Sequence, residues 1–126
     1  MSATLLVVED TPLNLKLFRI LLRSAGYQVL EAETGRRALE VLRDVVPDLI
    51  IMDLQLPEID GIEVIETFRA DPRMAQVPVI VVSGYAMKRD EDDALKAGAD
   101  RFLPKPVDNR LLLDSVAELL RSGRRT

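Results

Sequence analysis

The chain has 126 residues, with 17 Lys and Arg against 21 Asp and Glu, a formal net charge of −4, and no His or Cys. It therefore has no disulfide, no thiolate or imidazole nucleophile, and no Cys- or His-ligated metal. Any chemistry must use carboxylates, hydroxyls, amines and the backbone. The acidic balance argues against direct binding of nucleic acid, because neutralising phosphates needs a basic face. The basic residues cluster only in the tail, at Arg121, Arg124 and Arg125.

This length fits one domain. We expect a single domain over residues 1–126, with a core over about residues 4–120 and a short basic tail at 121–126 that could also be the stub of a linker. No apolar run approaches the roughly 20 residues that cross a bilayer, and the start of the chain lacks the features of a signal peptide. We therefore expect a cytoplasmic protein with no membrane insertion.

Five short segments have the composition of strands. The first, third and fourth are continuous runs of Leu, Ile, Val and Met, which is typical of strands that helices cover on both faces. In chain order, the predicted strands are Leu5–Val8, Tyr27–Glu31, Leu49–Met52, Val79–Val82 and Arg101–Leu103.

Segments with helical periodicity lie between these strands. Thr11 and Pro12 are typical of an N-cap and a first helical residue, and the first helix runs toward Gly26. Later helices are predicted to begin near Thr34, Asp60, Ala86 and Asp108, and the fourth stops at Gly98. Alternating strands and helices predict right-handed crossovers and a parallel sheet between two helix layers, a doubly wound α/β sandwich.

In such a fold the ligand site lies beyond the carboxyl ends of the strands. Glu9 and Asp10 follow the first strand, Asp53 the third and Ser83 the fourth, while Lys105 comes shortly after the fifth. We expect these five side chains to share one edge of the sheet.

Three clustered carboxylates raise one another's pKa unless a cation neutralises them. An all-oxygen site with open positions suits Mg²⁺, which pairs carboxylates with phosphate oxygens. Glu9, Asp10 and Asp53 are therefore predicted to form a magnesium site that receives a phosphoryl group. Asp53 is the predicted nucleophile, because carboxylates form acyl phosphates. Lys105 and Ser83 would bind the phosphoryl oxygens.

Four motifs carry a resemblance to a known family. They are VVED after the first strand, MDLQLPEIDG around the third, VVSGYA after the fourth and FLPKP after the fifth. In this order and spacing the sequence resembles, over essentially its whole length, the receiver domain of two-component response regulators, a CheY-like family. The stretch from GYAMKRD to FLPKP further resembles single-domain regulators of the DivK type and receivers attached to hybrid sensor kinases.

The resemblance implies a flavodoxin-like fold with strand order 2-1-3-4-5 and Mg²⁺ or Mn²⁺ as cofactor. It also implies that Asp53 is the phosphoacceptor and that Gln55 binds the metal through its backbone carbonyl. Ser83 and Phe102 fall at the two switch positions, and the Lys105-Pro106 bond is implied to be cis. A Phe in a strand is also a common core residue, so packing alone competes with the switch role of Phe102.

The implied function is a signalling phosphoacceptor, not an enzyme with turnover substrates. A histidine kinase or histidine phosphotransfer domain would supply the phosphoryl group, and a downstream protein would read the change. Because this chain has no His, that phosphohistidine must lie on another chain or domain. The expected output surface is formed by Tyr85, Ala86, Met87, Lys88 and Phe102.

Two other classes share parts of this pattern. An FMN-binding flavodoxin needs a phosphate loop after the first strand, where Glu9 and Asp10 would repel the phosphate. A magnesium-dependent phosphatase also uses an aspartyl nucleophile, but this chain has no second acid placed for hydrolysis and no cap segment. Three further acids, Asp48, Asp60 and Asp100, are expected to have turn or cap roles.

The first helix is apolar on more than one face. At about 100° per residue, Leu13, Leu17, Ile20 and Leu21 cluster on one side. The other apolar residues, spaced i, i+3, i+7, would form a stripe beside the site, and we hypothesise that it docks the phosphodonor. This predicted stripe is Leu15, Phe18 and Leu22, and Tyr85 and Met87 are further predicted docking residues.

Overall fold

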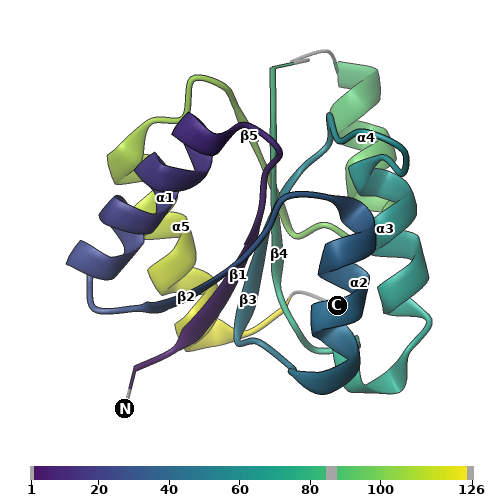
Figure 1. The fold of residues 1–126 in the computed structure, drawn as a ribbon, viewed down its shortest axis with the longest axis horizontal. Helices are drawn as coiled ribbons and strands as arrows, with labels where there is room; N and C mark the ends of the chain where they lie inside the picture. Colours follow the sequence, from purple (N-terminus) through teal and green to yellow (C-terminus); the bar gives the residue numbers. More distant parts are fainter. Residues whose placement is uncertain (1, 85–87, 125–126) are drawn as a thin grey trace.

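A computed structural model describes residues 2–84 and 88–124 of the chain. Strands and helices alternate along it, and the five strands lie between two helix layers (Figure 1). The strands are β1 (Thr4–Val8), β2 (Gln28–Ala32), β3 (Leu49–Asp53), β4 (Val79–Ser83) and β5 (Arg101–Pro104). The helices are α1 (Pro12–Ser24), α2 (Gly35–Asp44), α3 (Gly61–Arg69), the short 3₁₀ turn η1 (Pro72–Met74), α4 (Lys88–Ala97) and α5 (Asn109–Ser122).

All strand pairs are parallel, in the order β2-β1-β3-β4-β5. This confirms the predicted α/β fold and its strand order. The predicted strands agree with the observed ones to within one residue at each end. The predicted start of the fourth helix at Ala86 lies outside the described residues.

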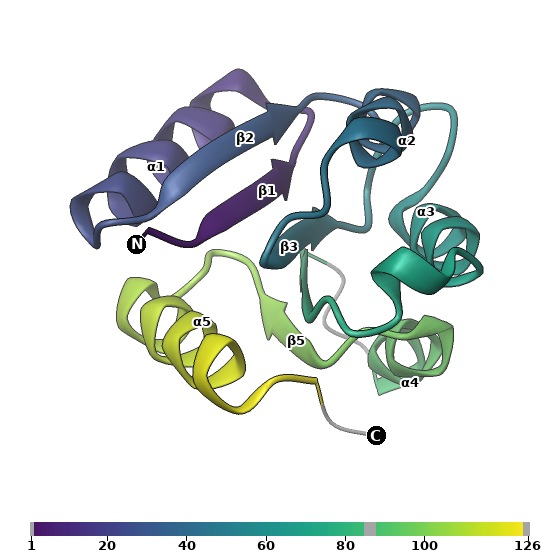
Figure 2. The ribbon, with the colours of Figure 1, turned by 90° about the horizontal axis from the view of Figure 1, so that it is seen from below.

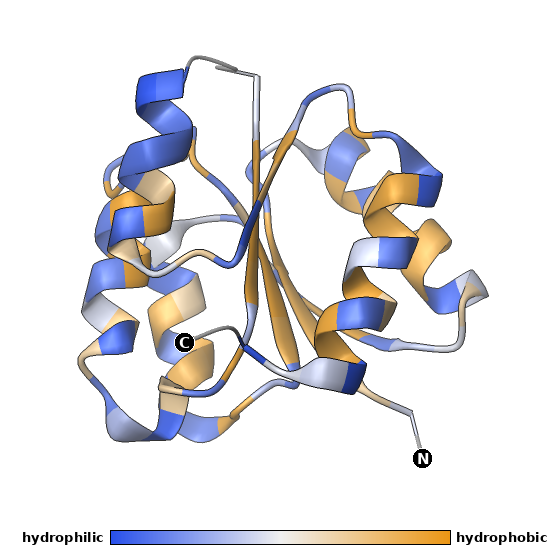
Figure 3. Cartoon of the chain, turned by 180° about the vertical axis from the view of Figure 1, so that it is seen from behind, coloured by the Kyte–Doolittle hydropathy of each residue, from blue (hydrophilic) through white to orange (hydrophobic). Residues whose placement is uncertain are grey.

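The sheet has two apolar faces because alternate residues of each strand point to opposite sides. In β1, Leu6 and Val8 pack with the layer of α2, α3 and α4, whereas Leu5 and Val7 pack with α1 and α5. The central strands β3 and β4 are buried at every position. Figure 3 shows the strands as the apolar centre and the outer helix faces as largely hydrophilic.

Local sequence signals set most helix ends. The side chains of Thr34, Asp60 and Asp108 accept hydrogen bonds from the first-turn amides of α2, α3 and α5, as expected of N-caps. Pro12 begins α1, and Thr11 stands at the N-cap position without a side-chain cap, while its backbone amide donates to Glu9 Oε2. At the far ends of α1 and α4, Gly26 and Gly98 adopt positive φ values of 96° and 123°.

The predicted docking stripe on α1 is wrong. Its members Leu15, Phe18 and Leu22 are buried, with exposed fractions of 4%, 8% and 0%. They pack against β1, β3 and α5 in the core. The exposed apolar residues of α1 lie on its other face and are Leu13, Leu17 and Ile20. The helical spacing identified two apolar faces, but only the position of α1 against the sheet decides which one is buried.

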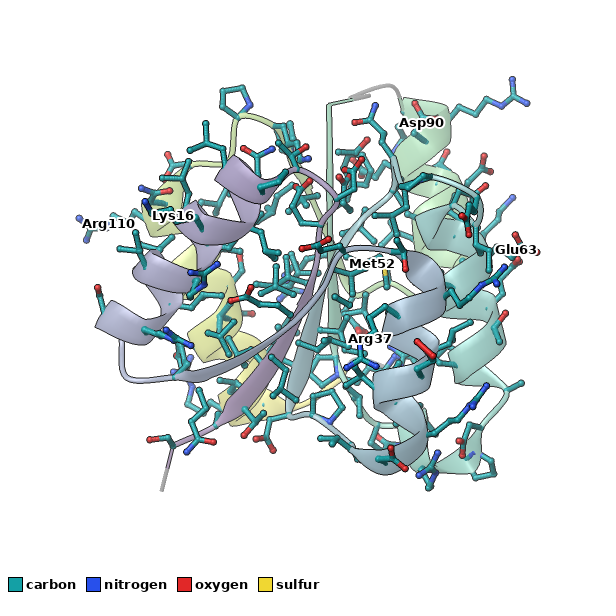
Figure 4. The ribbon with its side chains drawn as sticks, in the orientation of Figure 1. Lys16, Arg37, Met52, Glu63, Asp90 and Arg110 are labelled. Carbon is teal, nitrogen blue, oxygen red and sulfur yellow. The ribbon has the colours of Figure 1, made fainter. Side chains whose placement is uncertain are left out.

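Charged side chains surround the two helix layers. Figure 4 places Lys16 and Arg110 at the outer edge of the α1 and α5 layer and Glu63 at the outer edge of the opposite layer, while Met52, a residue of β3, lies in the interior. Within residues 2–84 and 88–124, no helix combines the length and hydrophobicity that a bilayer crossing requires.

Candidate functional site

Asp53 is the last residue of β3 and lies at the carboxyl edge of the sheet, yet its exposed fraction is only 1%. Its Oδ1 accepts a hydrogen bond of 3.0 Å from the Gln55 amide. The turn that follows is closed by a bond of 3.1 Å from the Gly61 amide to the Leu54 carbonyl. A Cβ at Gly61 would stand 2.5 Å from the Asp53 carbonyl oxygen, so only glycine allows α3 to begin this close to the strand.

Lys105 joins the ends of β1 and β3 across the site. Its Nζ donates to Glu9 Oε1 at 2.8 Å and to Asp53 Oδ2 at 3.0 Å. Glu9 is fully buried, and its second oxygen, Oε2, accepts from the Thr11 amide at 3.0 Å. Two buried carboxylates therefore share one ammonium group, and the three side chains carry a net charge of −1.

A third carboxylate completes the acidic group. Glu9, Asp10 and Asp53 can each place one oxygen within 4.8 Å of the others. Asp10 is exposed and opens onto a cleft of about 570 Å³, which Gln55 and Asp90 also line. This donor set suits a hard divalent cation with open coordination positions. The sequence prediction that these three acids converge is confirmed.

Burial dominates the electrostatics of the acceptor carboxylate. It raises the pKa of Asp53 to about 6, with the charge of Glu9 adding to this effect, while hydrogen bonds from Gln55 and Lys105 oppose it. Burial also acts to raise the pKa of Glu9, but its bonds from Lys105 and Thr11 outweigh burial and hold that pKa below its usual range. For Lys105, burial is outweighed by the two carboxylates, which raise its pKa. The ionised Asp53 is thus the destabilised member of the group.

We expect Asp53→Asn to stabilise the metal-free fold by about 2 kcal/mol at about pH 8. The folded pKa of about 6 lies above the usual 3.8, so ionised Asp53 costs stability above pH 6 and protonated Asp53 costs none below 3.8. The gain should therefore shrink as the pH falls from about 6 to about 4. Urea unfolding of the wild type and of Asp53→Asn in EDTA, at several pH values, measures this gain in stability. A gain that is constant with pH would contradict this account.

The other predicted site residues lie close by. Ser83 ends β4 and is fully buried, at the same edge as Asp53. Phe102 in β5 is half-buried and packs against the core on the α4 side. The Lys105-Pro106 peptide is cis, which confirms that expectation. The predicted docking residues Tyr85 and Met87 lie outside the described residues.

Three acids were expected to have turn or cap roles, and the structure confirms this for Asp60 only. The side chains of Asp48 and Asp100 instead bind backbone amides of distant strands. Asp48 accepts from the Thr4 amide at 2.7 Å, and Asp60 caps α3. Asp100, which directly precedes β5, accepts a hydrogen bond of 2.9 Å from the amide of Val79, the first residue of β4.

The sequence interpretation missed a groove beside Lys105. It has a volume of about 650 Å³ and runs along the exposed side of α1 to the loop between β5 and α5. No sequence pattern brings Pro106 and Val107 next to α1, since this depends on the packing of α5. The residues that line the groove are Asn14, Leu17, Phe18, Ile20, Leu21, Ser24, Lys105, Pro106, Val107 and Asn109.

The fold and the site together define the class of protein. A parallel α/β sandwich carries a buried carboxylate, two acidic neighbours and a lysine at the carboxyl ends of its strands. Residues 5–117 match the response regulator receiver domain family, and the chain belongs to that family. It is thus a receiver of two-component signalling, a phosphoacceptor module rather than an enzyme.

Similar proteins agree on this family. The chain is 37% identical over 120 residues to the polar-differentiation response regulator DivK of Brucella ovis, covering 95% of this chain and 98% of that protein. The receiver domain of a histidine kinase from Syntrophus aciditrophicus has a TM-score of 0.90 and 34% identity, covering 99% of this chain and 95% of that one. A receiver domain of a sensor histidine kinase from Pseudomonas aeruginosa, described with magnesium in its active-site cleft, has a TM-score of 0.90 and 30% identity, with 97% and 100% covered.

Proposed function

We propose that the chain, acting as a single receiver domain over residues 1–126, accepts a phosphoryl group on Asp53 from a phosphohistidine. The histidine belongs to a kinase or a histidine phosphotransfer domain. The observation that carries the proposal is the buried Asp53 carboxylate, which lies within 3.0 Å of Lys105 Nζ and within reach of two further carboxylates. Kinase phosphohistidine derives from ATP, so the proposed exchange takes place in the cytoplasm.

In the transfer, a carboxylate oxygen of Asp53 attacks phosphorus, the phosphorus–nitrogen bond to the imidazole breaks, and the imidazole leaves with the nitrogen electron pair. Gln55 holds Asp53 Oδ1 through its amide, which leaves Oδ2 on the Lys105 side as the attacking oxygen. Positioning of this kind supplies much of the catalysis in phosphoryl transfer. Lys105 already lies beside Oδ2 and neutralises charge on the incoming phosphoryl oxygens.

Mg²⁺ fits the oxygen donors at this site. Asp10 and Asp53, assisted by Glu9 and the Gln55 backbone carbonyl, are the residues that would hold it. When bound, the ion would neutralise the crowded carboxylates and the phosphoryl oxygens. Mn²⁺ suits the same ligands.

Ser83 and Phe102 are the proposed switch residues. Phosphorylation adds about −1.5 to −2 charges at Asp53. The buried Ser83 hydroxyl, at the end of the neighbouring strand, would hydrogen-bond a phosphoryl oxygen. Phe102, in the strand beyond it, would then repack and change the surface around β4, α4, β5 and α5 for a downstream protein.

Beryllofluoride, which imitates an aspartyl phosphoryl group, tests the proposal. We expect it to bind the wild type with Mg²⁺, with saturable NMR shifts at Gln55, Ser83 and Lys105. Asp53→Asn should abolish binding, because the acceptor oxygen is lost. Asp60→Asn is the matched control, since it changes an exposed acid of the same loop and keeps the cap. Binding to Asp53→Asn, or binding of FMN instead, would refute the phosphoacceptor function.

The groove beside Lys105 is the proposed docking site for the phosphodonor. Its walls combine apolar residues of α1 with Pro106 and Val107, which adjoin the residue that contacts Asp53. Leu17 and Ile20 expose 56% and 53% of their surfaces there. A helical histidine-bearing domain could cover this face and bring its imidazole to the acceptor.

We expect Leu17→Glu combined with Ile20→Glu to slow phosphotransfer from a cognate kinase at least about tenfold, since each charge disrupts a buried apolar contact. Phosphorylation by acetyl phosphate should be unchanged, because this small donor needs no docking face. Leu95→Glu on α4, where the leucine is 42% exposed, is the control. Equal transfer rates in the double variant and the wild type would argue against this docking face.

A further inference from the structure

The described end of the tail folds back beneath the sheet. After α5 ends at Ser122, Gly123 has a φ of 77° and turns the chain toward the amino end of β5. Figure 2 shows this segment passing from α5 under β5 toward α4. We call Gly123 and Arg124 the tail latch.

Arg124 uses its guanidinium group on three acceptors. Its Nε donates to Asp100 Oδ1 at 3.2 Å, Nη1 to the Ala75 carbonyl at 3.1 Å, and Nη2 to the Gly98 carbonyl at 3.1 Å. These acceptors come from the turn after η1, the end of α4 and the start of β5. One side chain therefore ties the tail to both ends of the connection between α4 and β5.

A second arginine, Arg69, binds two of the three acceptor residues of Arg124. Arg69 donates to Asp100 Oδ2 at 3.3 Å and to the Gly98 carbonyl at 2.9 Å, so these two residues keep a partner when Arg124 leaves, and only the Ala75 carbonyl is not shared with Arg69. The Asp100 side chain is only 3% exposed and also accepts from the Val79 amide. Burial and the nearby charge of Arg124 lower the pKa of Arg69 to about 10, against the opposing effect of Asp100, so Arg69 remains charged at neutral pH.

The charges of Arg69, Arg124 and Asp100 also favour Arg124 as the arginine that can leave. Two guanidinium groups share one carboxylate, and the release of Arg124 leaves a matched pair of Arg69 and Asp100. The side chain of Arg124 is 22% exposed, against 10% for Arg69, so water can reach the Arg124 contact. Arg69 is thus the permanent partner of Asp100, and Arg124 is the exchangeable one.

We infer that the tail latch is a conformational control on the switch, holding the α4–β5 connection in the unphosphorylated packing. This inference rests on the proposed function, in which α4 and β5 repack when Asp53 is phosphorylated. Contacts that are present in one packing and lost in the other shift the equilibrium toward the first. Arg124 contacts Gly98 and Asp100, the residues between which α4 gives way to β5, so docking of the latch resists movement there.

Arg124→Ala tests the latch directly. We expect amide hydrogen exchange to accelerate about tenfold in peptides covering 75–80 and 97–103, and to stay unchanged in β1 and α1. Arg124→Lys keeps the charge but loses the planar fork, so it should give an intermediate rate. Arg121→Ala removes an exposed charge of the same tail and should match the wild type.

The same variants test control of the switch. With Mg²⁺, Arg124→Ala should bind beryllofluoride about fivefold more tightly than the wild type, because the latch no longer opposes repacking. Unchanged local exchange would overturn the latch. Faster exchange with unchanged beryllofluoride affinity would show a purely structural contact and overturn the control role. A wild type that does not bind beryllofluoride would instead refute the phosphoacceptor function, and with it the coupling.

Discussion

Lys105→Met should lower the stability of the metal-free protein by about 2 kcal/mol at about pH 8. The substitution leaves Glu9 and Asp53, which are 0% and 1% exposed, without the cation that both contact. The loss is smaller than for a fully enclosed pair, because the Lys105 side chain is itself 21% exposed. Phosphorylation by acetyl phosphate should also slow about a hundredfold, because a preorganised charge beside Asp53 Oδ2 is removed. Urea unfolding in EDTA and phosphorylation rates measure the two effects.

A double variant separates charge repulsion from lost packing. Lys105→Met combined with Asp53→Asn should recover more than half of the lost stability, because only the Glu9 carboxylate then needs a partner. Adding Mg²⁺ should likewise stabilise Lys105→Met more than it stabilises the wild type. If neither change restores stability, Lys105 contributes through its packing and the shared-cation account is wrong.

Gly61→Ala should destabilise the fold by about 2–3 kcal/mol, a large effect for one methyl group. The new Cβ would stand 2.5 Å from the Asp53 carbonyl oxygen and 2.9 Å from the Leu54 Cα, and backbone atoms cannot move aside as a flexible side chain can. Relief of this clash displaces the turn that carries Asp53, so the affinity for beryllofluoride should also fall about tenfold. Chemical unfolding and a beryllofluoride titration measure both changes.

Gly84→Ala is the matched control for stability. A Cβ there would meet its nearest atom, the side-chain oxygen of Gln55, at 3.4 Å, an ordinary contact with a movable group. We expect a change within about 0.5 kcal/mol. Similar losses for the two alanine variants would mean that the close approach at Gly61 is not the cause.

The strands and the acidic site were predictable because each has a local signal. Val79–Val82 is an uninterrupted apolar run, and such a run fits a strand that is buried on both faces. Once the strands are parallel, the residues that follow them share one edge, so Glu9, Asp10 and Asp53 had to converge. The helix starts at Asp60 and Asp108 were predictable for the same reason, because each cap binds an amide only three residues further along the chain.

The apolar faces of α1 were not predictable in this way. Leu15 and Leu17 have the same hydrophobicity, but the first is 4% exposed and the second 56%. The difference comes from how α1 lies on the sheet and against α5, which periodicity within one helix does not contain. The role of Asp100 was foreseen only in part, because its two arginine partners are 31 and 24 residues away along the chain.

The sequence by itself determined the chemistry that this protein has available. With no His or Cys, it has a carboxylate as acceptor and depends on another chain or domain for its phosphohistidine. Only the tertiary structure decided how that chemistry is arranged: Lys105 shared between two buried carboxylates, a groove beside it, and Arg124 fastened under β5. These contacts join residues far apart in the sequence, so they arise only when the helix layers close on the sheet.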